Sequence, residues 1–154
     1  MNPRQHVLVR VAFVLALACC ARAVLAQGSS DPCKLLTPAE VSGIVGVAVR
    51  AGQSMGTNSC QWGAQDASKS SVRATLRLMD LQGFTSMEKP LAGVTKATAS
   101  GIGDGAIYST LGNLVTLSVK KGKVAFAVRL YGVPDADKQM AMEKSLALDV
   151  VARL

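Results

Sequence analysis

The sequence predicts an α+β domain in which a mainly antiparallel sheet is covered on one face by an N-terminal, a middle and a C-terminal helix. Three segments alternate apolar and polar residues with the period of two of a half-buried strand, at residues 71–79, 114–120 and 124–131. Three others carry helix start signals or helical spacing of apolar residues, at residues 37–46, 81–91 and 134–154. Because each strand has one apolar face, we expect the helices to cover that face.

The first helix has the clearest local signal. Thr37 is a suitable N-cap, and Pro38 stands at the first helical position, where its missing N–H has no partner to lose. Glu40 lies three residues after Thr37 and completes a capping box. Gly46 is a natural stop, so the helix is expected to end just before it.

Strands and loops are expected between this helix and the middle one. Residues 47–49 are read as a short strand, and residues 51–59 and 63–70 as loops rich in small polar residues. Cys60 begins a strand in which Trp62 is expected to fill the core. The alternating strand of residues 71–79 then leads to the helix.

The second half is expected to form three strands and a helix. The middle helix, residues 81–91, carries Phe84, Met87 and Leu91 at helical spacing. Residues 95–105 are read as turns, and a short strand follows at 106–110. The alternating strands come next and meet at a hairpin centred on Lys121 and Gly122. The last helix runs from residue 134 to the C-terminus.

Residues 1–26 are typical of a secretory signal peptide. Basic residues precede an apolar run over residues 11–21, and Val24-Leu25-Ala26 ends in a small residue suited to cleavage. This run is too short for a membrane-spanning helix, which needs about 20 apolar residues. Residues 27–32 are expected to be a flexible tether, and residues 33–154 one domain without a transmembrane span. The chain is therefore predicted to be periplasmic or secreted; lipid anchoring through Cys19 or Cys20 is the alternative.

Composition excludes several kinds of chemistry from the mature chain. The single histidine, His6, lies in the signal peptide, so no imidazole remains for nucleophile activation, base catalysis or metal binding. Three of the 17 basic residues and none of the 10 acidic ones lie there too, which leaves a formal charge of +4. That charge is mild, and aromatic residues are few, so nucleic acid is not expected as a partner. We expect no catalytic residues, metal or cofactor.

Two cysteines remain after cleavage, Cys33 and Cys60. An even pair in an exported chain predicts a disulfide. The alternative, a redox-active pair of thiols, would need closer spacing such as C-x-x-C.

The segment Asp31-Pro32-Cys33-Lys34-Leu35-Leu36-Thr37-Pro38-Ala39-Glu40-Val41, followed by Cys60-Gln61-Trp62, resembles a family of small exported bacterial proteins. The Gly101–Ala106 segment and the C-terminal helix are similar to it as well, so the resemblance covers most of the mature chain. Many members look like lipoproteins, from which this chain departs. The family is a domain of unknown function; it implies an exported location and the disulfide, and no activity.

Two motifs have structural interpretations that we favour. Ser86 and Lys89 match the Ser-x-x-Lys spacing of penicillin-binding enzymes, but the partner motifs are missing. The glycine-rich loop at residues 101–105 lacks the P-loop ending and precedes a strand, which favours a turn with Asp104 bonding to local backbone N–H groups.

The leading candidate site is the polar face of the sheet. If the alternating strands are neighbours, one face carries three arginines, a tyrosine and several hydroxyl groups; the candidates are Arg73, Thr75, Arg77, Arg129 and Tyr131. Such a face could bind an anionic small molecule or an acidic patch on an envelope protein. The alternative is an ordinary solvated sheet face.

The function predicted from these observations is a non-enzymatic exported binding domain. Two alternatives remain open: a small hydrolase that works without histidine, and an envelope-structural or inhibitor protein.

Overall fold

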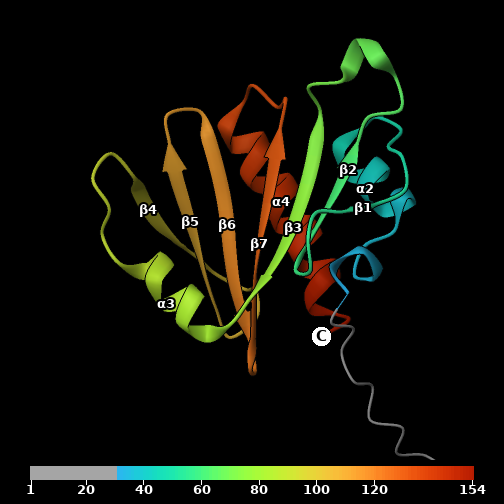
Figure 1. Cartoon of the computed structure of the whole chain (residues 1–154). Coiled ribbons are helices and arrows are strands. Elements are labelled where there is room, and N and C mark those ends of the chain that lie inside the picture. The colour runs from blue at the N-terminus through green and yellow to red at the C-terminus, as the bar shows by residue number, and fades with distance from the viewer. Residues whose placement is uncertain (1–30) are drawn as a thin grey trace, which may run out of the picture.

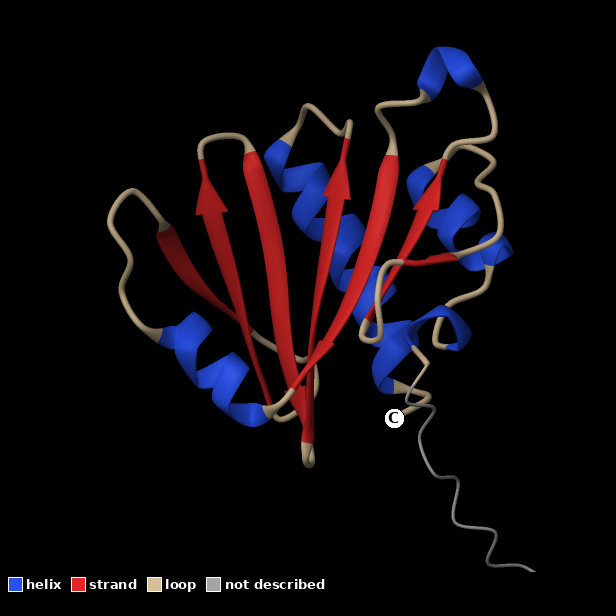
Figure 2. Cartoon of the chain, in the orientation of Figure 1, coloured by secondary structure: helices blue, strands red, loops and turns tan. Residues whose placement is uncertain are grey.

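The computed structural model describes residues 31–154 and contains one seven-stranded sheet with helices on both faces (Figures 1 and 2). Two short 3-10 helices are η1 (Pro32–Lys34) and η2 (Ala67–Lys69). The α-helices are α2 (Pro38–Val45), α3 (Leu81–Glu88) and α4 (Ala136–Val151). The strands are β1 (Gln53–Ser54), β2 (Ser59–Gly63), β3 (Arg73–Met79), β4 (Thr95–Ala99), β5 (Gly105–Leu111), β6 (Leu114–Lys121) and β7 (Val124–Tyr131). This arrangement confirms the predicted α+β class.

The strands lie in the order β1-β2-β3-β7-β6-β5-β4, and every neighbouring pair is antiparallel. β4 to β7 follow one another as a meander, and β7 then pairs with the whole length of β3. This pairing joins the two halves of the chain and places β3 beside β7, although the two strands are far apart in the sequence.

The main core lies between the sheet and α4, on the side that we call the α4 face. α4 and α2 lie behind the sheet in the view of Figure 1. The alternation predicted for β3, β6 and β7 is confirmed, because their apolar residues point to this face and are buried; they include Leu76, Leu117, Phe126 and Val128. Leu146, Ala147 and Val150 of α4 are fully buried against them.

The capping box of α2 forms as predicted. The backbone N–H of Glu40 donates to Thr37 Oγ1 at 3.3 Å, and the backbone N–H of Thr37 donates to Glu40 Oε2 at 2.8 Å. Gly46 ends the helix in the left-handed conformation, with φ of 74°. Arg153, just beyond α4, forms an ion pair with Glu40 and lowers the pKa of that carboxyl to about 2. The start of the domain is thereby connected to its C-terminus.

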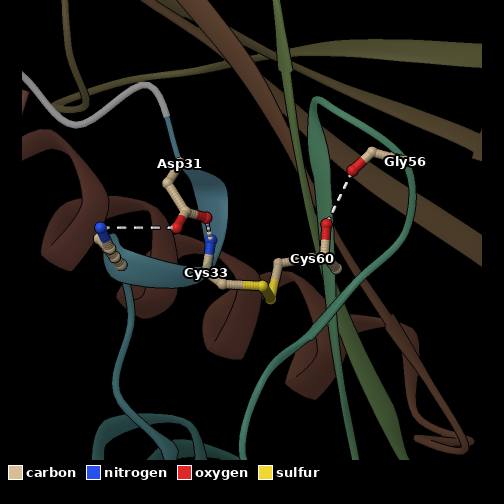
Figure 3. Close-up of a disulfide and its surroundings, with 6 residues drawn as sticks. Asp31, Cys33, Gly56 and Cys60 are labelled. Carbon is tan, nitrogen blue, oxygen red and sulfur yellow. Dashed lines mark hydrogen bonds and ion pairs between the residues drawn. A yellow bond between two sulfur atoms is a disulfide. The ribbon is translucent and has the colours of Figure 1, made fainter.

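The predicted disulfide joins Cys33 of η1 to Cys60 of β2, with the two Cα atoms 5.1 Å apart (Figure 3). Asp31 lies beside it, and its Oδ1 accepts a hydrogen bond from the backbone N–H of Cys33 at 3.0 Å. Trp62, two residues after Cys60, is fully buried as expected. Gly52 passes so close to both that a Cβ there would lie 2.7 Å from Cys60 Sγ and 2.8 Å from Trp62 Nε1.

The structure differs from the prediction in the position of the middle helix. α3 lies on the opposite side of the sheet from α4, in front of it in Figure 1, on the side that we call the α3 face. Phe84 of α3 is buried there, with Lys120 Nζ 5.3 Å from the centre of its ring. The helix ends at Glu88, earlier than predicted, because Pro90 restricts Lys89 to an extended conformation. The predicted polar face is therefore partly covered.

Three smaller differences concern strands. Residues 95–99, predicted as turns, form β4, and residues 53–54, predicted as loop, form β1. Residues 47–49 make only an isolated bridge, between Val49 and Ala64. Each of these segments takes its conformation from pairing with another strand, and the residues of the segment alone do not specify that pairing.

The predicted signal peptide, with Cys19 and Cys20, lies outside the described residues, as do residues 27–30 of the tether. Asp31 and Pro32, also predicted as tether, belong to the start of η1, where Pro32 is buried. Within residues 31–154, no helix is long and apolar enough to cross a membrane.

Candidate functional site

Strand pairing brings the five predicted binding residues onto one face. In the register of β3 and β7, Arg73 is opposite Tyr131 and Thr75 is opposite Arg129. Directly opposed residues point to the same side of a sheet. Arg77, two residues after Thr75, points to the same side, which is the α3 face.

The guanidinium groups of two of these arginines lie close to the tyrosine ring. The guanidinium carbon of Arg73 is 4.7 Å from the ring centre of Tyr131, and that of Arg129 is 6.0 Å from it. Both distances are within the range of cation–π interactions. Arg129 Nη1 also donates to the Tyr131 hydroxyl at 3.3 Å. Tyr131 therefore helps to hold Arg129 in place, and Arg73 contacts the same tyrosine ring.

α3 converts part of this face into a groove. Asp80 caps the helix by accepting a hydrogen bond from the backbone N–H of Gly83 at 2.7 Å. Phe84 anchors the helix on β6 and β7, and Met87, one turn later, projects over the sheet beside it. The apolar side of this short helix thus faces the polar side of the sheet.

The groove has two lobes. The β3 lobe, with a volume of about 260 Å³, extends over β2 and β3 and is lined by residues that include Met55, Gln61, Thr75, Arg77 and Met79. The β5 lobe, about 200 Å³, extends over β5 and β6 and is lined by residues that include Leu91, Val94, Lys96, Ser109, Leu111 and Leu114. Four residues line both lobes: Met87, Thr116, Ser118 and Arg129. We call these four residues the junction.

At the junction, some hydrogen-bond donors have no partner among the described residues. Arg129 Nε donates to Thr116 Oγ1 at 2.7 Å, whereas Nη2 has no hydrogen-bond partner among the described residues. Ser118 is fully buried, and its hydroxyl also has no partner in the described part of the chain. The hydroxyl of Ser109, in the β5 lobe, is buried in the same way. Buried polar groups normally find a partner, so the hydroxyls of Ser118 and Ser109 stand out.

The charges that line the groove are all positive. Arg77, Arg129 and Lys96 contribute side chains, and no aspartate or glutamate is among the described residues that line either lobe. The ammonium group of Lys96 donates to the main-chain oxygen of Met87. An anion would therefore meet attraction and no opposing carboxylate inside the groove.

A buried carboxyl lies behind the junction, on the α4 face. β6 pairs with β7 from Lys121 only as far as Leu117. Beyond that point the two strands separate, and side chains of α4 form hydrogen bonds with backbone groups that the strands leave unpaired. Gln139 Nε2 donates to the carbonyl of Leu130 at 3.0 Å, and the backbone N–H of Leu130 donates to Glu143 Oε1 at 3.0 Å. These contacts anchor α4 where the strands separate.

Burial raises the pKa of Glu143 to about 7, against the opposing effects of hydrogen bonds from Gln139 and Leu130 and of the charge on Arg129. Its second oxygen, Oε2, is buried with no partner among the described residues. Sequence reasoning missed this pair. Gln139 and Glu143 extend the apolar stripe of Leu146 and Val150 toward the start of α4 at helical spacing, and that pattern would have identified them.

The other sequence candidates lie apart from the groove. Ser86 and Lys89 are exposed, and the Ser86 hydroxyl donates to the carbonyl of Gln82 in its own helix at 2.9 Å. Asp104 accepts a hydrogen bond from the backbone N–H of Gly122 at 2.6 Å, so its backbone partner lies in the β6–β7 hairpin. Among residues 31–154, no three side chains of the metal-binding types come together.

In comparisons with known proteins, no family model, no curated protein and no solved structure matches this chain significantly. The resemblance noted from the sequence therefore stays a prediction, and the function has to be inferred from the groove itself.

Proposed function

We propose that this chain is an exported, non-enzymatic binding domain that takes a small anionic ligand in the groove beneath α3. The observation that carries the proposal is the junction. There a guanidinium nitrogen of Arg129 and the hydroxyl of Ser118 have no partner, and no carboxylate lines the surrounding walls.

A carboxylate or phosphate group suits this arrangement chemically. Its oxygens would accept from Arg129 Nη2 and from the hydroxyls of Thr116 and Ser118. Hydrogen bonds between ions and donors are about twice as strong as neutral ones. Leaving a buried hydroxyl unpaired costs about 1–3 kcal/mol, so a ligand oxygen at Ser118 would also remove a penalty in the free protein.

The five candidate residues take different parts in this proposal. Arg129 binds the anion, while Thr75 and Arg77 line the adjoining β3 lobe. Arg73 and Tyr131 line neither lobe and act as positioning residues, because they contact Arg129 or its tyrosine partner.

Export and a periplasmic or secreted location belong to the same proposal. They are supported by the Cys33–Cys60 disulfide and by the signal-like N-terminal sequence. An intact mass of the protein from its host that fits residues 27–154 with two hydrogens fewer would support them. A diacylglyceryl group on Cys19 or Cys20 would instead show the lipid-anchored alternative.

Binding can be tested by titrating the protein with butyrate and with inorganic phosphate while amide correlation spectra are recorded. We expect shifts concentrated at Thr116, Ser118 and Arg129, and their loss in Arg129→Gln. Arg50→Gln, an exposed arginine outside the groove, is the matched control and should leave the shifts unchanged. If neither anion shifts the junction, the proposal is wrong.

The two alternative functions have less support from this site. Ser86 and Lys89 line neither lobe, so the groove offers nothing to a hydrolase built on them. An inhibitor or envelope-structural role predicts a protein partner instead, and co-purification of a stoichiometric complex from the envelope would favour it.

A further inference from the structure

Exposed apolar side chains gather at the rim of the groove. The large apolar residues with the greatest exposure include Leu91 at 66%, Leu111 at 56% and Met55 at 56%. Leu91 and Leu111 line the β5 lobe, Met55 lines the β3 lobe, and the exposed Met87 lines both. Clustered exposed apolar groups mark binding sites, whereas isolated ones need no explanation.

The two lobes differ in character. Outside the junction, the β5 lobe is lined by Lys96, Ser109 and four apolar side chains on its two sides: Leu91 and Val94 come from the segment after α3, and Leu111 and Leu114 from the β5–β6 hairpin. The β3 lobe carries Gln61, Thr75 and Arg77 besides its methionines. A ligand with an apolar part would therefore place that part in the β5 lobe.

The charged junction adjoins this apolar lobe directly. Arg129, Thr116 and Ser118 line the β5 lobe at the same time as they line the β3 lobe. Met87 covers the boundary, and the unbranched, polarizable methionine side chain adapts to the shape of an apolar chain. The volumes of the two lobes together fall in the range of about 300–1,000 Å³ that small-molecule sites occupy.

We propose that the ligand is an anionic single-chain amphiphile, with its carboxylate at Arg129, Thr116 and Ser118 and its hydrocarbon chain in the β5 lobe beneath Met87. This inference rests on the proposed anion-binding function and adds the chemical class of the ligand. The observation behind the inference is that unpartnered hydrogen-bond donors lie next to an apolar lobe. Both lie beneath a helix that packs on the polar side of the sheet.

The test is a calorimetric titration of the chain from residue 27 onward with butyrate, hexanoate, octanoate and decanoate, below the concentrations at which they aggregate. Each methylene buried should lower Kd about threefold to fourfold, until the lobe is filled. Val94→Phe, which fills the β5 lobe, should weaken decanoate binding at least tenfold and butyrate binding by a smaller factor, because fewer butyrate carbons enter the lobe. Leu148→Phe adds the same ring on exposed α4 surface and should change neither.

The outcomes separate this inference from the proposed function. If decanoate binds no more tightly than butyrate and both need Arg129, anion binding stands and the amphiphile is refuted. If neither binds, the amphiphile is refuted, and anion binding is refuted with it when inorganic phosphate also leaves the junction unshifted. If uncharged decanol binds as tightly as decanoate, the anionic group has no role and the amphiphile proposal is again refuted.

A measurement on the unaltered protein guards against a variant that fails to fold. Nuclear Overhauser contacts from the decanoate chain to the methyl groups of Met87, Leu91 and Val94 are expected. Contacts to Met55 and Met79 alone would place the chain in the β3 lobe and overturn the assignment.

Discussion

Replacement of Glu143 by glutamine should change how the stability of this domain depends on pH. Glu143 is fully buried, and its pKa rises from 4.5 to about 7, with burial as the largest cause. The folded state therefore binds a proton more tightly than the unfolded state, and stability falls as pH rises between these two values. Below about pH 4.5 the favourable contribution is complete, and above about pH 7 it is lost.

The size of the effect follows from the same two pKa values. Each pH unit between them is worth about 1.4 kcal/mol, so the whole difference amounts to roughly 3 kcal/mol. Glutamine resembles the protonated acid in shape and keeps an oxygen for the N–H groups of Leu130 and Gln139. Glu143→Gln should therefore match the wild type near pH 4 and exceed its free energy of unfolding by roughly 3 kcal/mol near pH 8.5.

Urea unfolding followed by the fluorescence of Trp62, the only tryptophan, measures this directly. The pH range is favourable because residues 27–154 contain no histidine to titrate within it. Glu88→Gln, at an exposed glutamate, is the matched control and should follow the wild-type curve. If the free energy of unfolding depends on pH in the same way for the wild type and for Glu143→Gln, the reasoning is refuted, because ionisation of the buried carboxyl would then cost the domain no stability.

Three further predictions concern stability. Replacing Cys33 and Cys60 together by serine should lower the free energy of unfolding by roughly 3–4 kcal/mol, the loop-closure entropy for a sequence separation of 27; a loss under about 1 kcal/mol in urea titrations would contradict this. Glu40→Gln should cost about 1 kcal/mol or less at neutral pH, because solvent screens its ion pair. Since the pKa of Glu40 is lowered to about 2, the difference from wild type should disappear as pH falls from 4.5 toward 2, and a difference that persists in acid melts would argue against it. Gly52→Ala should destabilise the domain because the added Cβ would overlap the sulfur atom of Cys60. Gly43→Ala should stabilise the domain by about 0.5–1 kcal/mol, because Gly43 lies within α2 and a Cβ there would meet no other atom. Thermal melts that rank the two variants the other way would contradict the close approach at Gly52.

Part of the candidate site could be predicted from the sequence. Alternation in β3 and β7 placed Arg73, Thr75 and Arg77 on one side of their strand, and Arg129 and Tyr131 on one side of theirs. Strand periodicity is local and can be read from neighbouring residues. That the two sides form one face depends on β3 pairing with β7 in this register, which the alternation alone does not specify and the structure shows.

The groove was beyond sequence reasoning. Phe84 and Met87 indicated an amphipathic helix, but an apolar stripe can pack on either face of a sheet, and nothing in residues 81–88 names the face. The sequence pattern predicts this helix on the apolar face, together with the other two helices. The roof of the groove, and with it the junction, exists because α3 packs on the polar face.

By itself the sequence determined what is encoded within a few residues. The capping box of Thr37 and Glu40 and the alternation of the long strands are of this kind, because each depends on short-range geometry. The pairing of Cys33 with Cys60 could be predicted for another reason, because residues 27–154 contain no other cysteine. Tertiary structure alone decided the side on which α3 lies, the formation of β4, and the insertion of Gln139 and Glu143 between separating strands. These features depend on contacts between residues far apart in the chain, whose energies become defined only when the whole sheet has assembled.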